Sequence, residues 1–162
     1  MSRELKKLGE FKVKSGKLFL SDPCYSREIW CQIKDIEAEN GDWNAFVIES
    51  DDNHWDNGNN ICAELLASHN DALSIFQTIF DQGEELPSEV GVDSGQAGIY
   101  DDEAFHSEDE NWYDKNCNIT VKNKAGVLDG GCVSRSGYGD GDYPAYVVRR
   151  NNKVVGVRIK FI

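Results

Sequence analysis

A glycine-rich run at residues 136–144, S-G-Y-G-D-G-D-Y-P, combines acids and tyrosines on a flexible backbone. Carboxylate and carbonyl oxygens are ligands for a hard cation such as Ca²⁺ and acceptors for a cationic partner. The run therefore predicts a binding loop, and calcium or another divalent cation is the only cofactor it suggests. The expected binding residues are Tyr138, Asp140, Asp142 and Tyr143. The alternative is a turn whose aspartates bond locally, because the spacing lacks the distal glutamate of a calcium loop.

A second pattern occurs twice earlier in the chain. Residues 13–22 and 92–101 both read V-x-S-G-x-x-x-aliphatic-x-D, and Ser136-Gly137 followed by Asp140 is a looser third occurrence. Each occurrence predicts a tight turn with glycine at a positive φ, then a short strand that ends in an aspartate. Reuse of turn chemistry in a β-rich protein explains the repetition locally, whereas structural equivalence would mean a shared site.

Structural equivalence would place the three trailing aspartates at one rim of the sheet. Crowded carboxylates raise one another's pKa or recruit a cation, so they can act as metal ligands or as a general base. The metal ligands expected on this hypothesis are Asp22, Asp101 and Asp140.

Tryptophans supply a second set of candidate contacts. Trp55 and Trp112 stand in polar, acidic stretches, which is typical of aromatic anchors on binding loops, whereas Trp30 and Trp43 are expected in the core. Cys24 is a candidate nucleophile only if a histidine lies beside it, and the histidines are expected at surface or capping positions. These histidines are His54, His69 and His106.

The elements that position these residues are mostly short strands. Alternating apolar residues predict a hairpin over 11–20, an interior strand over 43–48 and a terminal hairpin over 143–162 with its turn at Asn151-Asn152. Helical spacing predicts short helices within 25–36 and 73–80. We therefore expect a mainly β (α+β) fold, either an antiparallel sandwich or a partly open barrel, formed by residues 1–162 as a single domain.

Composition narrows the possible partners. The formal charge is −12, from 29 acidic and 17 basic residues, which disfavours direct binding to nucleic acid or to anionic membranes. No secretory signal and no apolar run of about 20 residues is visible, so we expect a cytoplasmic protein. The five cysteines lack C-x-x-C spacing, which fits buried thiols better than a zinc site or a disulfide framework.

Three strings together resemble a known but uncharacterised family. They are S-G at 15–16 leading to D-P-C-Y at 22–25, then G-V-D-S-G-Q-A-G at 91–98, then S-G-Y-G-D-G-D-Y-P at 136–144. The chain is similar here to small bacterial and phage proteins of unknown function. The resemblance implies a small β-rich domain, often encoded alone, and transfers no catalytic residue.

The leading hypothesis is a non-enzymatic binding or regulatory module that meets a protein or small-molecule partner through acidic and aromatic loops. One alternative is a metal-assisted hydrolase using clustered carboxylates. Another is an acidic mimic of nucleic acid that inhibits a basic partner, which only the net charge supports.

Overall fold

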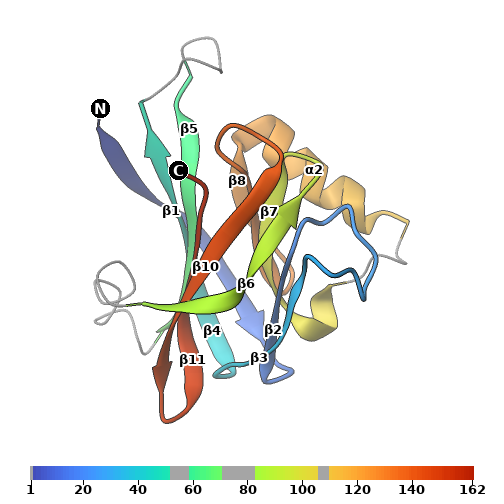
Figure 1. Ribbon diagram of the computed structural model, residues 1–162, viewed down its shortest axis with the longest axis vertical. Helices are drawn as coiled ribbons and strands as arrows, with labels where there is room; N and C mark the ends of the chain where they lie inside the picture. Colours follow the sequence, from blue (N-terminus) through green and yellow to red (C-terminus); the bar gives the residue numbers. More distant parts are fainter. Residues whose placement is uncertain (1, 52–58, 71–82, 106–109) are drawn as a thin grey trace.

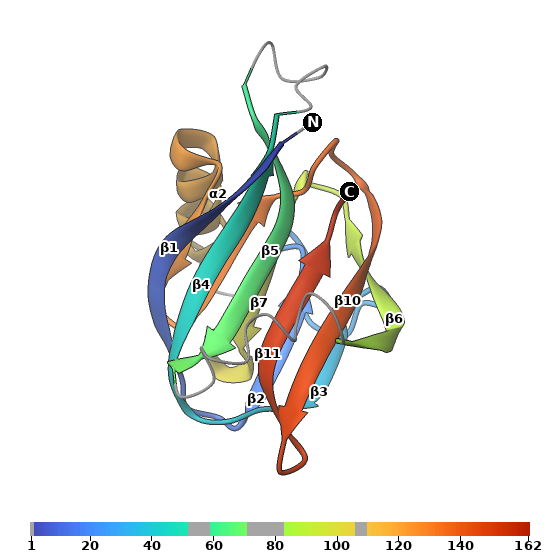
Figure 2. The same ribbon diagram turned by 90° about the vertical axis from the view of Figure 1, so that its left-hand side faces the viewer.

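Two antiparallel sheets pack face to face in the computed structural model, which describes residues 2–51, 59–70, 83–105 and 110–162. Figures 1 and 2 show the two layers from perpendicular directions. The sheets do not close into a barrel, so the predicted mainly β fold is confirmed as a sandwich.

The larger sheet has the strand order β1-β4-β5-β11-β10-β6. Its strands are β1 (Arg3–Val13), β4 (Gly41–Ser50), β5 (Ile61–His69), β11 (Lys153–Lys160), β10 (Gly141–Arg150) and β6 (Glu84–Val92). The smaller sheet has the order β3-β2-β7-β9-β8. Its strands are β3 (Ile33–Glu37), β2 (Lys17–Ser21), β7 (Gln96–Asp101), β9 (Gly131–Arg135) and β8 (Ala125–Leu128).

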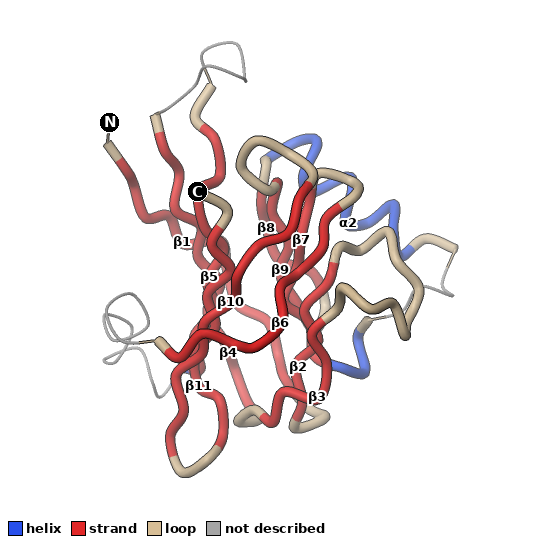
Figure 3. The backbone as a smooth tube through the Cα atoms, in the orientation of Figure 1, coloured by secondary structure: helices blue, strands red, loops and turns tan. Residues whose placement is uncertain are grey.

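Apolar side chains fill the space between the sheets because they alternate along the strands. Leu18 and Leu20 of β2 point inward to the same cluster as Trp43 of β4, whereas Phe19 points outward. The outer face of the smaller sheet is covered by the short 3₁₀ helix η2 (Asp102–Ala104) and by α2 (Trp112–Asn123), as Figure 3 shows. Trp112 was expected on a polar, acidic binding loop, whereas it begins α2.

The terminal hairpin is confirmed, with β10 paired to β11. Asn151 and Asn152 both have positive φ, 54° and 67°, as a two-residue turn that matches the twist of the strands requires. The hairpin expected over residues 11–20 is wrong in its pairing. β1 belongs to the larger sheet and β2 to the smaller one, so the turn between them carries the chain across the sandwich.

The helix expected within residues 25–36 is also wrong. Residues 22–32 form a loop, and residues 33–37 form β3. The Gln32 side chain accepts a hydrogen bond from the Ile29 amide at 2.9 Å and donates one to the Ser26 carbonyl at 2.7 Å. It thus satisfies backbone groups that a helix would otherwise pair. The short helix expected within residues 73–80 lies outside the described residues.

An approximate two-fold axis relates the first half of the chain to the second. Strands β1, β2, β3, β4 and β5 correspond in order to β6, β7, β9, β10 and β11. These pairs lie symmetrically about the β5–β11 ladder in the larger sheet and about the β2–β7 ladder in the smaller sheet. α2 and β8 lie between β7 and β9, where the first half has only the loop 22–32.

Residue pairing supports this symmetry at single-residue precision. Val13 pairs with Gly41 in the β1–β4 ladder, and the corresponding Val92 pairs with Gly141 in the β6–β10 ladder. Leu20 pairs with Ile99, its own counterpart, where the axis passes through the smaller sheet. The two matching sequence patterns therefore occupy equivalent places.

Candidate functional site

Asp22 ends the first copy of the pattern, residues 13–22, and is fully buried. It holds the turn that opens the second copy, residues 92–101. Its carboxylate accepts hydrogen bonds from the amides of Asp93 (2.8 Å) and Ser94 (2.7 Å) and from the Ser94 hydroxyl (2.6 Å). The amide of Cys24 donates a fourth bond at 2.8 Å. Such donors offset the loss of hydration of a buried carboxylate.

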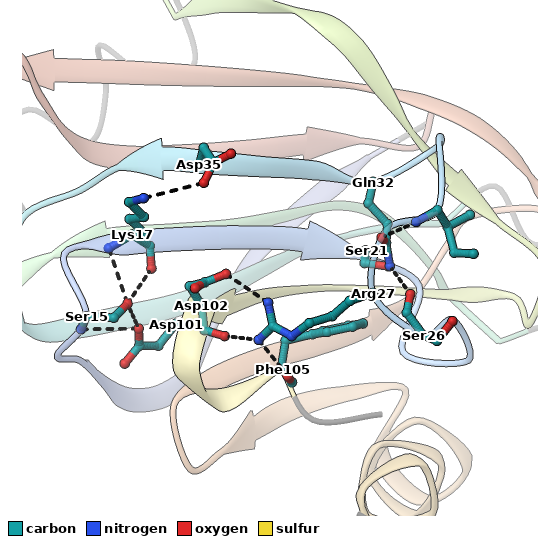
Figure 4. Close-up of polar contacts among 11 residues, drawn as sticks. Ser15, Lys17, Ser21, Ser26, Arg27, Gln32, Asp35, Asp101, Asp102 and Phe105 are labelled. Atoms are coloured by element: carbon teal, nitrogen blue, oxygen red, sulfur yellow. Dashed lines mark hydrogen bonds and ion pairs between the residues drawn. The ribbon is translucent and has the colours of Figure 1, made fainter. Parts of the chain in front are cut away.

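Asp101 makes the equivalent contacts in the opposite direction, as Figure 4 shows for its bonds to Ser15. Its carboxylate accepts hydrogen bonds from the amides of Lys14 (2.9 Å) and Ser15 (3.3 Å) and from the Ser15 hydroxyl. Each aspartate thus ends one copy of the pattern and holds the serine turn that opens the other. This reciprocal exchange follows from the antiparallel pairing of β2 with β7.

The same pairing keeps the predicted carboxylate cluster from forming. Leu18 of β2 faces Asp101, and Asp22 lies four residues further along, which separates the two backbones by about 13 Å. In the part of the chain that the structure describes, no group of three His, Cys, Asp or Glu side chains is placed to hold a metal ion. The structure thus does not bring Asp22, Asp101 and Asp140 together.

The third occurrence of the pattern is not equivalent to the other two. Ser136 and Gly137 lead from β9 of the smaller sheet to β10 of the larger one, whereas the other two turns lead from a strand of the larger sheet to a strand of the smaller one. The Asp140 carboxylate instead accepts a hydrogen bond from the Gly95 amide at 2.9 Å. Its counterpart is Asn40, whose side-chain oxygen accepts from the Gly16 amide at 2.7 Å. Asp140 is exposed, unlike the two buried aspartates.

Two further predicted contact residues support the fold. Tyr143 is half-buried, packs edge-on against Phe161 and donates its hydroxyl to the Gly139 carbonyl at 2.5 Å, so it braces the glycine-rich loop. Trp112 is buried at the start of α2 between the rings of Tyr100 and Phe105, so the prediction of an exposed anchor is wrong. Trp55 lies outside the described residues.

Cys24 is a poor nucleophile in this setting. Partial burial of the sulfur, and then the hydrogen bond and charge of Asp22, raise the pKa of the thiol to about 12, although the residue as a whole is exposed. The thiolate fraction is then negligible near neutral pH. His69 lies on β5 in the other sheet, where its ring contacts the Asn40 carbonyl at 2.9 Å. His54 and His106 lie outside the described residues.

Trp30 is the residue that the sequence reasoning misplaced most. It was expected in the core, yet 85% of its surface is exposed. Its neighbour Cys31 takes the inward position, and the Cys31 carbonyl accepts a hydrogen bond from the Gly91 amide of β6 at 2.9 Å. Helical spacing was the wrong template for this loop. The polar residues before Trp30, S-R-E at 26–28, were the signal that could have placed it on the surface.

The loop that carries Trp30 is anchored at several points. Arg27 donates to the Asp102 carboxylate at 3.0 Å and to the Phe105 carbonyl at 2.8 Å (Figure 4). Its guanidinium also lies over the Phe19 ring. The Tyr25 hydroxyl donates to the Asp93 carboxylate, and burial followed by this bond raises the pKa of Tyr25. A side chain on an anchored loop loses less conformational entropy when it binds a partner.

Three segments at this end of the sandwich together form a surface that we call the acidic rim. The 22–32 loop bonds to residues 91–94, and Gly95 bonds to both Ser136 and Asp140. The acidic rim consists of Trp30, Asp93, Tyr138, Asp140 and Asp142, all of them exposed. Among the described residues, none of its three carboxylates forms an ion pair with a lysine or arginine.

A cleft of about 910 Å³ lies away from the acidic rim, at the C-terminal end of β1 near η2 and α2. Its described lining mixes lysines with carboxylates, including Lys12, Lys14, Glu103 and Asp129, over the aromatic floor of Trp112. Serine, cysteine and histidine do not occur in this described part of the lining, which therefore shows no nucleophile with a base beside it.

Comparison with protein-family models, curated proteins and solved structures finds no match to this chain. The function is therefore argued from the acidic rim itself. Among the described residues, no helix has the length and apolar character needed to cross a membrane.

Proposed function

We propose that this protein is a non-enzymatic binding module whose acidic rim holds a basic segment of a partner protein. The observation that carries the proposal is Trp30, which exposes 85% of its surface on an anchored loop, and that loop bonds to the turn that carries Asp93. Asp93, Asp140 and Asp142 form no ion pair with a lysine or arginine of the described residues. Large exposed aromatic side chains are characteristic of contact sites, and tryptophan is enriched among the residues that dominate binding energy.

The chemistry of the rim favours a cationic partner. An arginine or lysine over the Trp30 ring gains a cation–π interaction of about 0.5–2 kcal/mol. Asp93, Asp140 and Asp142 add charge-assisted hydrogen bonds to the same cationic segment. Nucleic acid is disfavoured as a partner because its phosphates would meet both these carboxylates and the net charge of −12.

The two alternatives have less support. A metal-assisted hydrolase would need free carboxylates, whereas Asp22 and Asp101 are held by backbone and hydroxyl donors. A mimic of nucleic acid predicts binding that follows total charge, not one aromatic residue. Salt and point substitutions distinguish these hypotheses.

Binding of a fluorescein-labelled nona-arginine peptide, followed by fluorescence anisotropy, tests the proposal. We expect Trp30→Ala to raise the dissociation constant about tenfold, which corresponds to about 1.4 kcal/mol. Val121→Ala, which also shortens an exposed apolar side chain but on α2, should leave the dissociation constant unchanged.

The acids of the rim need a charge-matched control. Asp142→Asn should weaken peptide binding several-fold more than Glu4→Gln, which removes the same charge from an exposed position on β1. Equal effects of these two substitutions, together with full binding by Trp30→Ala, would show that only total charge matters and would sink the proposal.

A further inference from the structure

β8 is the one described strand that has no counterpart across the two-fold axis. It pairs with β9 along the edge of the smaller sheet and lies beside β1, where the Val127 side chain packs against Gly9. The axis relates β9 to β3 and β1 to β6. The place equivalent to that of β8 therefore lies between β3 and β6, which are neighbouring edge strands in Figure 2.

That place is a groove of about 480 Å³, within the usual size range of ligand pockets. Ile33 and Ile36 of β3 line one wall, and Leu86, Pro87 and Ser88 of β6 line the other. Ser88 stands where Gly9 stands in β1, because Glu10 pairs with Asn44 just as Glu89 pairs with Pro144. Gly9 leaves room for the Val127 side chain beside β1. The small residue Ser88 stands at the equivalent point of β6.

We propose that this groove binds a short extended segment of a partner protein, which pairs antiparallel with β3 as β8 pairs with β9. The segment resembles β8 in chemistry, with small and aliphatic residues of the type Ala-Gly-Val-Leu. One aliphatic side chain enters between Ile33 and Ser88 in the way that Val127 enters beside Gly9, because Ile33 is the counterpart of Cys132, the residue that pairs with Val127. Main-chain hydrogen bonds to the edge of β3 that pairs with no described strand supply affinity, and this pocket supplies specificity.

The edge of β3 also limits what can bind. Leu18 pairs with Ile36 and Leu20 with Ile33, so β3 contains one extra residue, and Asp35 takes a positive φ of 57°. A bulge of this kind interrupts regular pairing and prevents long strands from adding to an edge. The bound segment is accordingly short, like the four residues of β8, and its dissociation constant is on the order of 100 µM.

The direct probe is a blocked synthetic hexapeptide with the sequence of residues 124–129, K-A-G-V-L-D, titrated into the ¹⁵N-labelled full chain. We expect saturable amide shifts at Ile33–Glu37 and at Leu86 and Ser88. Ser88→Arg, an exposed substitution that fills the groove, should weaken binding at least tenfold. Ser26→Arg adds the same charge on the 22–32 loop and should leave binding unchanged.

Peptide shifts confined to β8 and β9, or no saturable shift at millimolar peptide, would overturn the assignment. The same peptide with proline in place of glycine should bind less tightly, because proline lacks the amide donor that edge pairing uses. Trp30→Ala should leave hexapeptide binding intact. A wrong assignment of the groove can therefore be distinguished from a wrong assignment of the acidic rim.

Discussion

Asp22 and Asp101 show how a buried charge becomes a structural tie. Each carboxylate is almost fully buried and accepts bonds from two consecutive amides and one serine hydroxyl of a turn that is distant in sequence. Hydrogen bonds to a charged group contribute about 1.5–3 kcal/mol each, and their loss leaves buried donors unsatisfied. The two side chains therefore fasten the two halves of the chain to each other.

Asp22→Ala should lower the free energy of unfolding by about 3–5 kcal/mol, because the amides of Asp93 and Ser94 lose their acceptor. Asp101→Ala should have a similar effect, as the two-fold relation requires. Asp140→Ala removes an exposed carboxylate with one backbone bond and should cost less than about 1 kcal/mol. Urea unfolding measures all three, and an Asp22→Ala loss no larger than that of Asp140→Ala would contradict the assigned role.

The sequence marked these aspartates correctly but could not identify their partners. The shared pattern placed a turn before each strand and an aspartate after it, as the structure has them. It could not show which turn each aspartate binds, because that depends on the pairing of β2 with β7, strands about 80 residues apart in the chain. Trp30 was misplaced for a related reason, since local apolar spacing does not show which residues of a loop other segments cover.

Among the elements, β7 and β9 pack unusually closely around one ring. Tyr100 is fully buried and covers two glycines, Gly98 on its own strand and Gly131 on the neighbouring strand. A Cβ added at Gly98 would lie 2.2 Å from the Tyr100 ring, and one at Gly131 would lie 2.5 Å from it. The backbone here depends on the absence of side chains, because close-packed interiors do not yield without strain.

Gly98→Ala should destabilise the protein by about 3 kcal/mol, since the Tyr100 ring cannot move away from its neighbours. Gly16→Ala is the matched control, because its φ is +74° but its Cβ would meet no atom within 4 Å. The control should lose only about 1 kcal/mol from backbone strain. Thermal unfolding compares the two, and equal losses would contradict the packing account.

Elements with strong local signals were predictable, and elements set by distant contacts were not. The terminal hairpin followed from its asparagine turn and alternating strands. The 11–20 segment showed equally clear strands, but the pairing of β1 with β4, not β2, is a long-range choice. α2 was missed because its sequence, W-Y-D-K-N-C-N-I-T-V-K-N, carries few apolar residues, and only Trp112, Asn116 and Thr120 are buried.

The two halves together form one sandwich in which thiols are buried in both halves and the phenol of Tyr100 is buried in the second. Burial raises the pKa of Cys62 and of Cys132 to about 12 from an ordinary value of 9.0, and it raises that of Tyr100 as well. A pKa raised in the folded state stabilises the fold below the unfolded value, and that stability is lost as pH rises through the folded value.

Stability should therefore be insensitive to these groups up to about pH 9 and should fall between pH 9 and 12. Each such thiol contributes a slope of up to about 1.4 kcal/mol per pH unit in that window. Urea unfolding at pH 8, 9, 10 and 11 measures how steeply the free energy of unfolding falls with pH. Cys132→Ala should reduce this slope by the contribution of one thiol. Unchanged stability up to pH 11 would contradict the burial of these groups.

Binding at the acidic rim is tested most directly by the indole N–H resonance of Trp30 in ¹⁵N-labelled protein, assigned from its loss in Trp30→Ala. Titration with an arginine-rich peptide at physiological salt should shift this resonance together with the amides of residues 93–95 and 138–142. A peptide that binds while the Trp30 indole and these amides stay unmoved would contradict the proposed function.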